Sequence, residues 1–212
     1  MNSLFSDYER FKPQIKGRLD EFKRNWKSEK AVFEELIFCL LTPQSKAIKC
    51  DQCVKYLFSK DPKDWGLAFV ESVLRKGPRF YRQKAKNVLA ARDAFYQNGR
   101  YLLKNILIEQ GIEHDKFKVR EWLVKNVRGF GMKEASHFLR NIGFYDDIAI
   151  IDRHILKNML HCGIIKEIPH TISRKKYIEM ENALRKFSEK KEIPMEALDL
   201  LFWAKQTGFV FK

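Results

Sequence analysis

Lys133 follows a short glycine-containing turn between two stretches of helical periodicity, REWLVKN and MKEASHFLRN. In the first turn of a helix the positive end of the helix dipole disfavours an ammonium group, so a lysine is a poor choice there for stability alone. The same field favours the neutral amine, which is the form that attacks a carbon electrophile. Lys133 is therefore a candidate nucleophile.

Asp152 follows the apolar stretch 148–151 and precedes RHILKNML, a segment with helical periodicity. An aspartate in this place is expected to cap the helix, and this ordinary structural role could be its only one. The helix dipole also favours the ionised carboxylate, which can stabilise a cation that develops during a reaction. Asp152 is a candidate for this electrostatic role as well.

The connection Arg128-Gly129-Phe130-Gly131 is short enough to require a tight hairpin between the two helices. The two glycines indicate a positive φ or the close approach of a ligand, with Phe130 anchoring the tip. Free N–H groups at the start of the second helix would bind an anion, such as a DNA phosphate. A plain helical hairpin with a glycine C-cap is the alternative interpretation.

The charge and the composition narrow the classes of protein. The chain has 41 Lys and Arg against 27 Asp and Glu, a formal net charge of +14, which favours a polyanionic partner. Hydrophobic residues make up 45% of the chain and aromatic residues 13%, which excludes a disordered protein. The sequence has no apolar run of membrane-spanning length and no secretory signal in MNSLFSDYERFK, so we expect a soluble, cytoplasmic protein.

The spacing of apolar residues predicts an all-α protein of about ten helices. Glycine and proline are few, 10 and 6 in 212 residues, which suggests long helices. The stretch RKKYIEMENALRKFSEKKE (174–192) is highly charged, and we interpret it as a solvated helix with Tyr177, Leu184 and Phe187 facing inward. Its charge alone indicates no function.

Four cysteines raise the question of a metal site. Cys50 and Cys53 form a C-x-x-C pair inside a helical pattern, whereas Cys39 and Cys162 are distant and no second pair completes a zinc site. We therefore predict buried or free thiols.

The pattern G-h-G-x-K (Gly129 to Lys133) together with D-x-H-I (152–155) resembles the helix-hairpin-helix DNA glycosylases. The segments LLTPQSKAIK (40–49) and GPRFYRQKAKNV (77–88) extend the resemblance over most of the chain. In its short length and its C-terminal GFVFK, the chain most resembles the compact archaeal and thermophilic-bacterial branch of 8-oxoguanine DNA glycosylase/AP lyases. Arg128 stands where many members have proline. The cysteine cluster that binds iron–sulfur in the endonuclease III branch is missing, which argues against that branch.

The resemblance implies a repair enzyme that flips 8-oxoguanine out of duplex DNA and removes it. Lys133 would attack C1′ and form a Schiff base that allows β-elimination, and Asp152 would stabilise the cationic sugar. Gln44 would fill the gap in the helix, and His154 would contact a phosphate near the flipped nucleotide. The residues expected to contact the phosphate backbone are Arg79, Arg82 and Lys84. The base pocket is expected near the C-terminus, formed by Trp203, Phe209 and the carboxylate of Lys212.

The same resemblance implies two helical subdomains that flank a cleft, one formed by about 31–145 with the hairpin at 120–144, the other by 1–30 and 146–212. No organic or redox cofactor is implied, and no metal beyond a monovalent cation held by backbone carbonyls at Gly129 and Gly131. The expected partner is double-stranded DNA containing damaged guanine, bound by a monomer associated with the nucleoid.

Two other functions stay open. A non-catalytic helix-hairpin-helix module would explain the charge and the hairpin, but it would not need both Lys133 and Asp152. A monofunctional glycosylase for another lesion would keep the aspartate and usually lack the lysine. Lys133 therefore favours the bifunctional enzyme.

Overall fold

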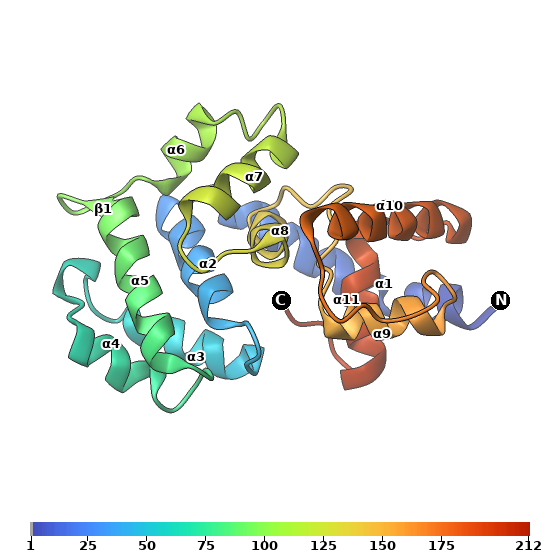
Figure 1. Ribbon diagram of the computed structural model, residues 1–212, viewed down its shortest axis with the longest axis horizontal. Coiled ribbons are helices and arrows are strands. Elements are labelled where there is room, and N and C mark those ends of the chain that lie inside the picture. Colours follow the sequence, from blue (N-terminus) through green and yellow to red (C-terminus); the bar gives the residue numbers. More distant parts are fainter. Residues whose placement is uncertain (1) are drawn as a thin grey trace. The chain divides into compact units, whose positions relative to one another are not determined.

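The computed structural model describes residues 2–212, with side chains described from Leu4 onward (Figure 1). Within these residues there are eleven α-helices, one short 3-10 helix and one two-stranded sheet. The prediction of an all-α fold is confirmed. No helix in residues 2–212 is both long and apolar enough to cross a membrane.

The chain divides into two compact units. The first, here called the continuous unit, comprises Asn25–Phe138; the second, the discontinuous unit, combines the chain up to Arg24 with Leu139–Lys212. These limits differ by several residues from the predicted subdomain limits at 31 and 145, which stay a prediction.

The continuous unit is built mainly from helices. Its elements are α2 (Glu29–Leu41), α3 (Ala47–Leu57), the 3-10 helix η1 (Pro62–Asp64), α4 (Leu67–Leu74), α5 (Tyr81–Phe95), β1 (Tyr96–Gln97), β2 (Arg100–Tyr101), α6 (Leu103–Glu109), α7 (Lys116–Asn126) and most of α8 (Met132–Asn141). Helix α2 is apolar on nearly every side, so it forms the buried centre, and α3, α5 and α6 pack around it (Figure 1). Ser28 caps its start by accepting from the Ala31 N–H.

The small sheet is the element that the sequence analysis missed. β1 pairs antiparallel with β2, and Tyr96 lies opposite Tyr101 with ring centroids 4.9 Å apart. Asn98 and Gly99 form the connection with φ values of 51° and 77°, as a tight two-residue hairpin of this twist requires. The Asn-Gly pair was the available signal for it.

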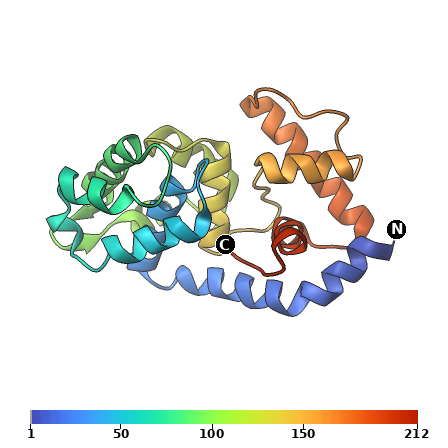
Figure 2. The same cartoon turned by 90° about the horizontal axis from the view of Figure 1, so that it is seen from below.

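The discontinuous unit contains nearly all of α1 (Asn2–Asn25), the end of α8, α9 (Arg153–His161), α10 (Arg174–Lys191) and α11 (Met195–Thr207). Helix α11 packs against α9 and α10 (Figure 2). Lys205 at its end pairs with Asp7 of α1 at 2.7 Å. Gly143 has a φ of 94°, and a Cβ at this position would lie 2.9 Å from the Cα of Lys23. The approach of α1 to the end of α8 therefore requires glycine.

A buried ion pair joins α8 and α11 within this unit. Arg140 pairs with Asp199 and its guanidinium also lies 5.1 Å from the ring centroid of Phe22. Burial raises the pKa of the Asp199 carboxyl above its usual range, and the positive charge of Arg140 opposes that shift. A pair of this kind is strongly destabilising when only one partner is removed.

The four cysteines are free thiols. Burial raises the pKa of Cys50 to about 11 and also raises that of Cys53. Their sulfurs face the carbonyls of Leu41 and Val73 at 3.2 and 3.6 Å. Among residues 2–212, no group of three or more His, Cys, Asp or Glu is placed to hold a metal ion.

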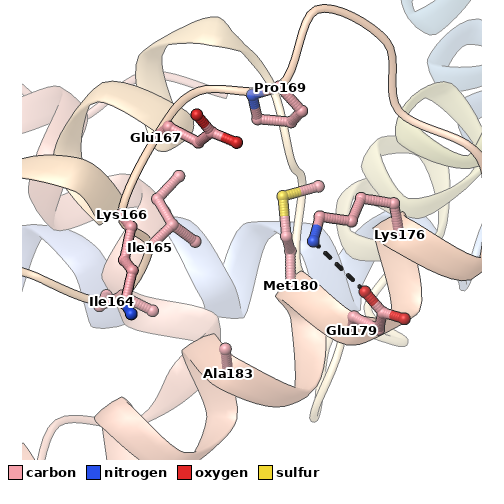
Figure 3. A pocket seen from close by; sticks show the side chains of 9 residues that line it. All are labelled: Ile164, Ile165, Lys166, Glu167, Pro169, Lys176, Glu179, Met180 and Ala183. Carbon is pink, nitrogen blue, oxygen red and sulfur yellow. Dashed lines mark hydrogen bonds and ion pairs between the residues drawn. The ribbon is translucent and has the colours of Figure 1, made fainter.

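A cavity of about 360 Å³ lies between α10 and the chain that follows α9 (Figure 3). Ile164, Ile165 and Met180 supply much of its apolar lining, and Lys176 pairs with Glu179 at its edge at 3.4 Å. None of the predicted site residues lines it.

Candidate active site and nucleic-acid interface

The hairpin between α7 and α8 has the tight geometry predicted from its glycines. The Phe130 N–H donates to the Val127 carbonyl at 3.1 Å, and the Phe130 ring is buried beside Phe138. Gly129 has a φ of 96°, and a Cβ there would lie 2.3 Å from Nδ2 of Asn87. Both features require glycine, so the expectation of a positive φ is confirmed at this position.

Gly131 does not have the positive φ of Gly129, and the alternative expected for it, close approach to the DNA, stays a prediction. Its N–H donates to Oε2 of Glu134 at 3.1 Å, and its carbonyl accepts the Ala135 N–H at 3.0 Å. Glu134 thus caps the start of α8 from the third helical position. The monovalent cation at the hairpin carbonyls stays a prediction.

Lys133 is the second residue of α8, in the first turn as predicted. Its side chain is 21% exposed, so it is partly buried and still open to solvent. Nζ lies 3.9 Å from Oε1 of Glu134, whose other oxygen caps the helix. Glu134 was not among the residues predicted from the sequence, although its place three residues after Gly131 is a known capping signal.

Gln44 lies on the turn between α2 and α3, where it is exposed and has a φ of 54°. A non-glycine residue in this region is strained by about 1 kcal/mol or more, so the surrounding structure must hold it. Lys84 of α5 does so. Its ammonium donates to the carbonyls of Leu41 and Pro43, each at 2.7 Å, and to Oγ of Ser45 at 2.9 Å.

Lys84 was expected to contact the DNA backbone, and its surroundings argue against that role. Its side chain is buried, and burial lowers the pKa to about 8. The group is still protonated at neutral pH and then has three N–H donors, which the three protein acceptors occupy. No donor is left for a phosphate, so Lys84 supports the Gln44 turn instead.

Arg79 and Arg82 are exposed, as a phosphate contact requires. Phe80 between them is 59% exposed and has a φ of 55°, and the guanidinium of Arg79 lies 5.3 Å from its ring centroid. The Arg79 N–H donates to Oγ of Ser45 at 2.9 Å, so this segment is tied to the Gln44 turn. Phe80 was missed in the sequence; an exposed aromatic between two arginines was the signal.

Asp152 is the N-cap of α9, as predicted. Its Oδ1 accepts the Ile155 N–H at 2.8 Å, and the residue is half-buried. Its second oxygen has no role in the cap.

His154 and Trp203 meet in a cavity of about 620 Å³ between α9 and α11. Their ring centroids are 5.8 Å apart with nearly perpendicular planes, and Nε1 of Trp203 is buried without a hydrogen-bond partner among the described residues. The cavity wall carries several basic side chains, from Arg153, Lys157, His161 and Lys205. Phe209 is 42% exposed and Lys212 is half-buried, and neither lines this cavity.

The predicted residues fall into two groups, one in each compact unit. The continuous unit holds the hairpin glycines, Lys133, Gln44, Arg79, Arg82 and Lys84, and the discontinuous unit holds Asp152, His154, Trp203, Phe209 and Lys212.

The chain matches known proteins over nearly its whole length. The family model described as 8-oxoguanine DNA glycosylase matches residues 15–193. A protein of Fusobacterium nucleatum named 8-oxoguanine DNA glycosylase/AP lyase is 38% identical, and the match covers 100% of this chain and 97% of that protein. A protein of the same name from Methanocaldococcus jannaschii is 42% identical, with 93% of this chain and 91% of that protein covered.

Solved structures agree with these matches. The crystal structure of the 8-oxoguanine DNA glycosylase of Thermotoga maritima has a TM-score of 0.86 and 35% identity, covering 99% of this chain and 96% of that chain. The Methanocaldococcus jannaschii 8-oxoguanine glycosylase/lyase, solved in complex with a 15mer DNA containing 8-oxoguanine, has a TM-score of 0.84 and 38% identity. The match covers 99% of this chain and 99% of that chain.

Proposed function

Because the chain belongs to the 8-oxoguanine DNA glycosylase family, we propose that it excises 8-oxoguanine from double-stranded DNA and then nicks the strand as an AP lyase. The observation that carries the lyase assignment is the half-buried Lys133 in the first turn of α8, directly after the Gly129 hairpin. A binding module has no use for an amine held in that place.

In the first step the amine of Lys133 attacks C1′ of the flipped nucleotide. The new N–C bond forms as the bond between C1′ and the base breaks, and the base leaves with the electron pair and takes up a proton. The amine must lose protons in this sequence, and Glu134, with Oε1 3.9 Å from Nζ, is the neighbouring carboxylate able to receive one. Opening of the sugar ring then gives a protonated imine.

The imine allows the strand to be cut. Loss of a proton from C2′ sends electrons toward the positively charged nitrogen and expels the 3′ phosphate, which is β-elimination. Water then releases the sugar fragment and restores Lys133.

Asp152 acts during base release in this proposal. Positive charge develops on the sugar as the base departs, and a carboxylate fixed by the α9 cap can stabilise it without reorganising. His154 and Trp203 line the cavity between α9 and α11 of the same unit, where His154 would contact a phosphate and Trp203 would pack against the base. Phe209 and the Lys212 carboxylate, which do not line that cavity, would complete the base pocket.

The DNA is held by the continuous unit through the hairpin, the Gln44 turn and the segment from Arg79 to Arg82. Gln44 would fill the space left by the flipped base, and Phe80 would enter the base stack beside it, because an exposed aromatic ring can separate neighbouring bases. We further propose that the enzyme works as a monomer on the chromosome in the cytoplasm.

Borohydride reduction on duplex DNA that contains 8-oxoguanine tests the function directly. Reduction fixes the imine as a stable amine, so the enzyme becomes covalently joined to the DNA. A monofunctional glycosylase would release the base without being trapped, and a binding module would do neither. Undamaged duplex is the control substrate, and an absence of both trapping and base release would contradict the proposal.

Replacing the exposed Arg79 and replacing the buried Lys84 should have different effects on the salt dependence of DNA affinity. Arg79→Ala should reduce the slope of log affinity against log salt by about 0.9, the loss of one phosphate contact. Lys84→Met should leave the slope unchanged, because its donors are occupied within the protein. Fluorescence anisotropy with an uncleavable duplex over a salt series measures both. Equal reductions in the two variants would show that Lys84 contacts the backbone after all.

Deletion of Lys212 should impair excision of 8-oxoguanine by about tenfold or more and affect a preformed abasic site much less. The Lys212 carboxylate is proposed to accept hydrogen bonds from the flipped base, and a preformed abasic site has no base to recognise. Single-turnover rates on the two substrates measure the difference. Equal losses on both, or no loss on either, would mean that the tail is structural and that the lesion is read elsewhere.

A further inference from the structure

The chain that leads into Asp152, residues 148–151, is buried and lies outside the helices and strands, so its backbone polar groups need partners inside the protein. Ile148, Ala149 and Ile151 are 4%, 3% and 2% exposed. No strand pairs with this segment, and the Asp152 N–H turns back to the Ile150 carbonyl at 3.0 Å. Two side chains of α10 supply partners for the backbone groups of Ala149 and Ile151.

Tyr177 bonds to this segment twice. Its hydroxyl donates to the Ala149 carbonyl at 2.7 Å and accepts the Ile151 N–H at 3.1 Å. Glu181, four residues later on the same helix face, accepts the Ala149 N–H through Oε1 at 2.9 Å. Both side chains are buried, at 3% and 2% exposed. These three bonds reproduce what a neighbouring β-strand would provide.

These hydrogen bonds fix the backbone directly before Asp152. The Ile151 N–H that Tyr177 fixes belongs to the residue directly before Asp152, and the Ala149 amide and carbonyl lie three residues before it. A displacement of a reacting group by about 1 Å can lower a rate by about 100-fold. The backbone that enters α9 therefore sets where the Asp152 carboxylate is held.

Helix α10 is the stretch whose high charge indicated no function in the sequence. Its exposed charges surround a buried face, and that face carries a tyrosine hydroxyl and a carboxylate in addition to apolar residues such as Met180 and Leu184. Apolar packing alone needs neither polar group, and burying them is unfavourable unless they are hydrogen-bonded. Their three bonds to one backbone segment explain why they are there.

We propose that Tyr177 and Glu181 are positioning residues that hold Asp152 for base release. The proposal rests on the proposed function of Asp152. In this role Tyr177 and Glu181 act through the backbone before Asp152, and they need no contact with the DNA.

The test compares two substrates with Tyr177→Phe, which removes one oxygen and keeps the ring. Excision of 8-oxoguanine should fall about 10- to 100-fold in single-turnover rate, with little change in DNA affinity. Nicking of a preformed abasic site should change less than threefold, because that step begins at Lys133 and releases no base. Tyr8→Phe is the matched control: Tyr8 is 8% exposed and lies in the same unit, and its variant should keep both rates.

Glu181 gives a second variant pair that does not rely on Tyr177→Phe folding well. Glu181→Gln keeps an oxygen acceptor for the Ala149 N–H and should retain most of the excision rate. Glu181→Met removes that acceptor and should show the selective loss on 8-oxoguanine. Circular dichroism fixes an assay temperature at which each variant is folded.

Selective loss of excision in Tyr177→Phe or Glu181→Met, with retention in Glu181→Gln, supports the proposal. Equal loss on both substrates, or unchanged ratios in folded variants, overturns it and leaves the two residues as parts of the core. If Asp152→Asn itself does not slow base release, or the wild-type chain does not excise 8-oxoguanine, the proposed function has failed first.

Discussion

Lys133→Gln should lose borohydride trapping and strand nicking completely, a fall on the order of 10³-fold or more, while it still binds DNA. Glutamine is close to lysine in length and lacks an amine that can form an imine. Its neutral amide avoids the unfavourable charge at the start of α8, so the variant should be at least as stable as the wild type. Gel analysis of trapped and nicked DNA, with anisotropy for binding, measures all three properties.

Lys118→Gln is the matched control for the loss of one positive charge. Lys118 is exposed on α7 of the same unit and lies away from the hairpin in sequence, so its variant should trap and nick DNA normally. A Lys133→Gln protein that still nicks abasic DNA would contradict the assignment of the nucleophile.

Asp152→Asn should slow base release by about 10²- to 10⁴-fold and leave the protein folded. Asparagine caps a helix about as well as aspartate, so the bond to the Ile155 N–H is kept while the negative charge is lost. The expected change in the free energy of unfolding is therefore only about a few tenths of a kcal/mol. Single-turnover excision and a thermal melt measure the two effects separately.

Asp115→Asn tests the same exchange at a cap outside the proposed site. Asp115 caps α7 by accepting the N–H groups of Phe117 and Lys118, each at 3.0 Å. This variant should match Asp152→Asn in stability and keep full activity. If Asp152→Asn instead melts much earlier and excises normally once folded, the aspartate is only a cap.

The sequence contained the information for the helices and for the two residues of the proposed chemistry. Lys133 and Asp152 were located by local signals, a glycine hairpin and a helix cap, which depend on neighbouring residues and on the helix dipole. The turn at Asn98-Gly99 carried an equally local signal that was overlooked. Its strands are two residues long, too short to show the alternation of a sheet.

Other features depend on contacts between distant parts of the chain and leave no local pattern. Lys84 has the spacing and charge of a surface residue, and only its contact with the turn about forty residues earlier shows that it is buried. The bonds from α10 to residues 149 and 151 are of the same kind. The left-handed conformation of Gln44 is held by such contacts rather than by its own residue type.

The composition of the discontinuous unit has a consequence for how the chain folds during synthesis. Helix α1 leaves the ribosome before the other described helices, yet its apolar residues Phe11 and Phe22 belong to a unit whose other part begins at Leu139. The continuous unit can fold from one uninterrupted stretch, because it contains all of its own segments. The first helix must wait with its hydrophobic face uncovered until the last segment appears, and a contact of such long sequence separation forms slowly. The unit that carries Asp152 is therefore completed after the continuous unit, and a chain that stops between Phe138 and Asp152 would contain Lys133, the proposed nucleophile, without the carboxylate.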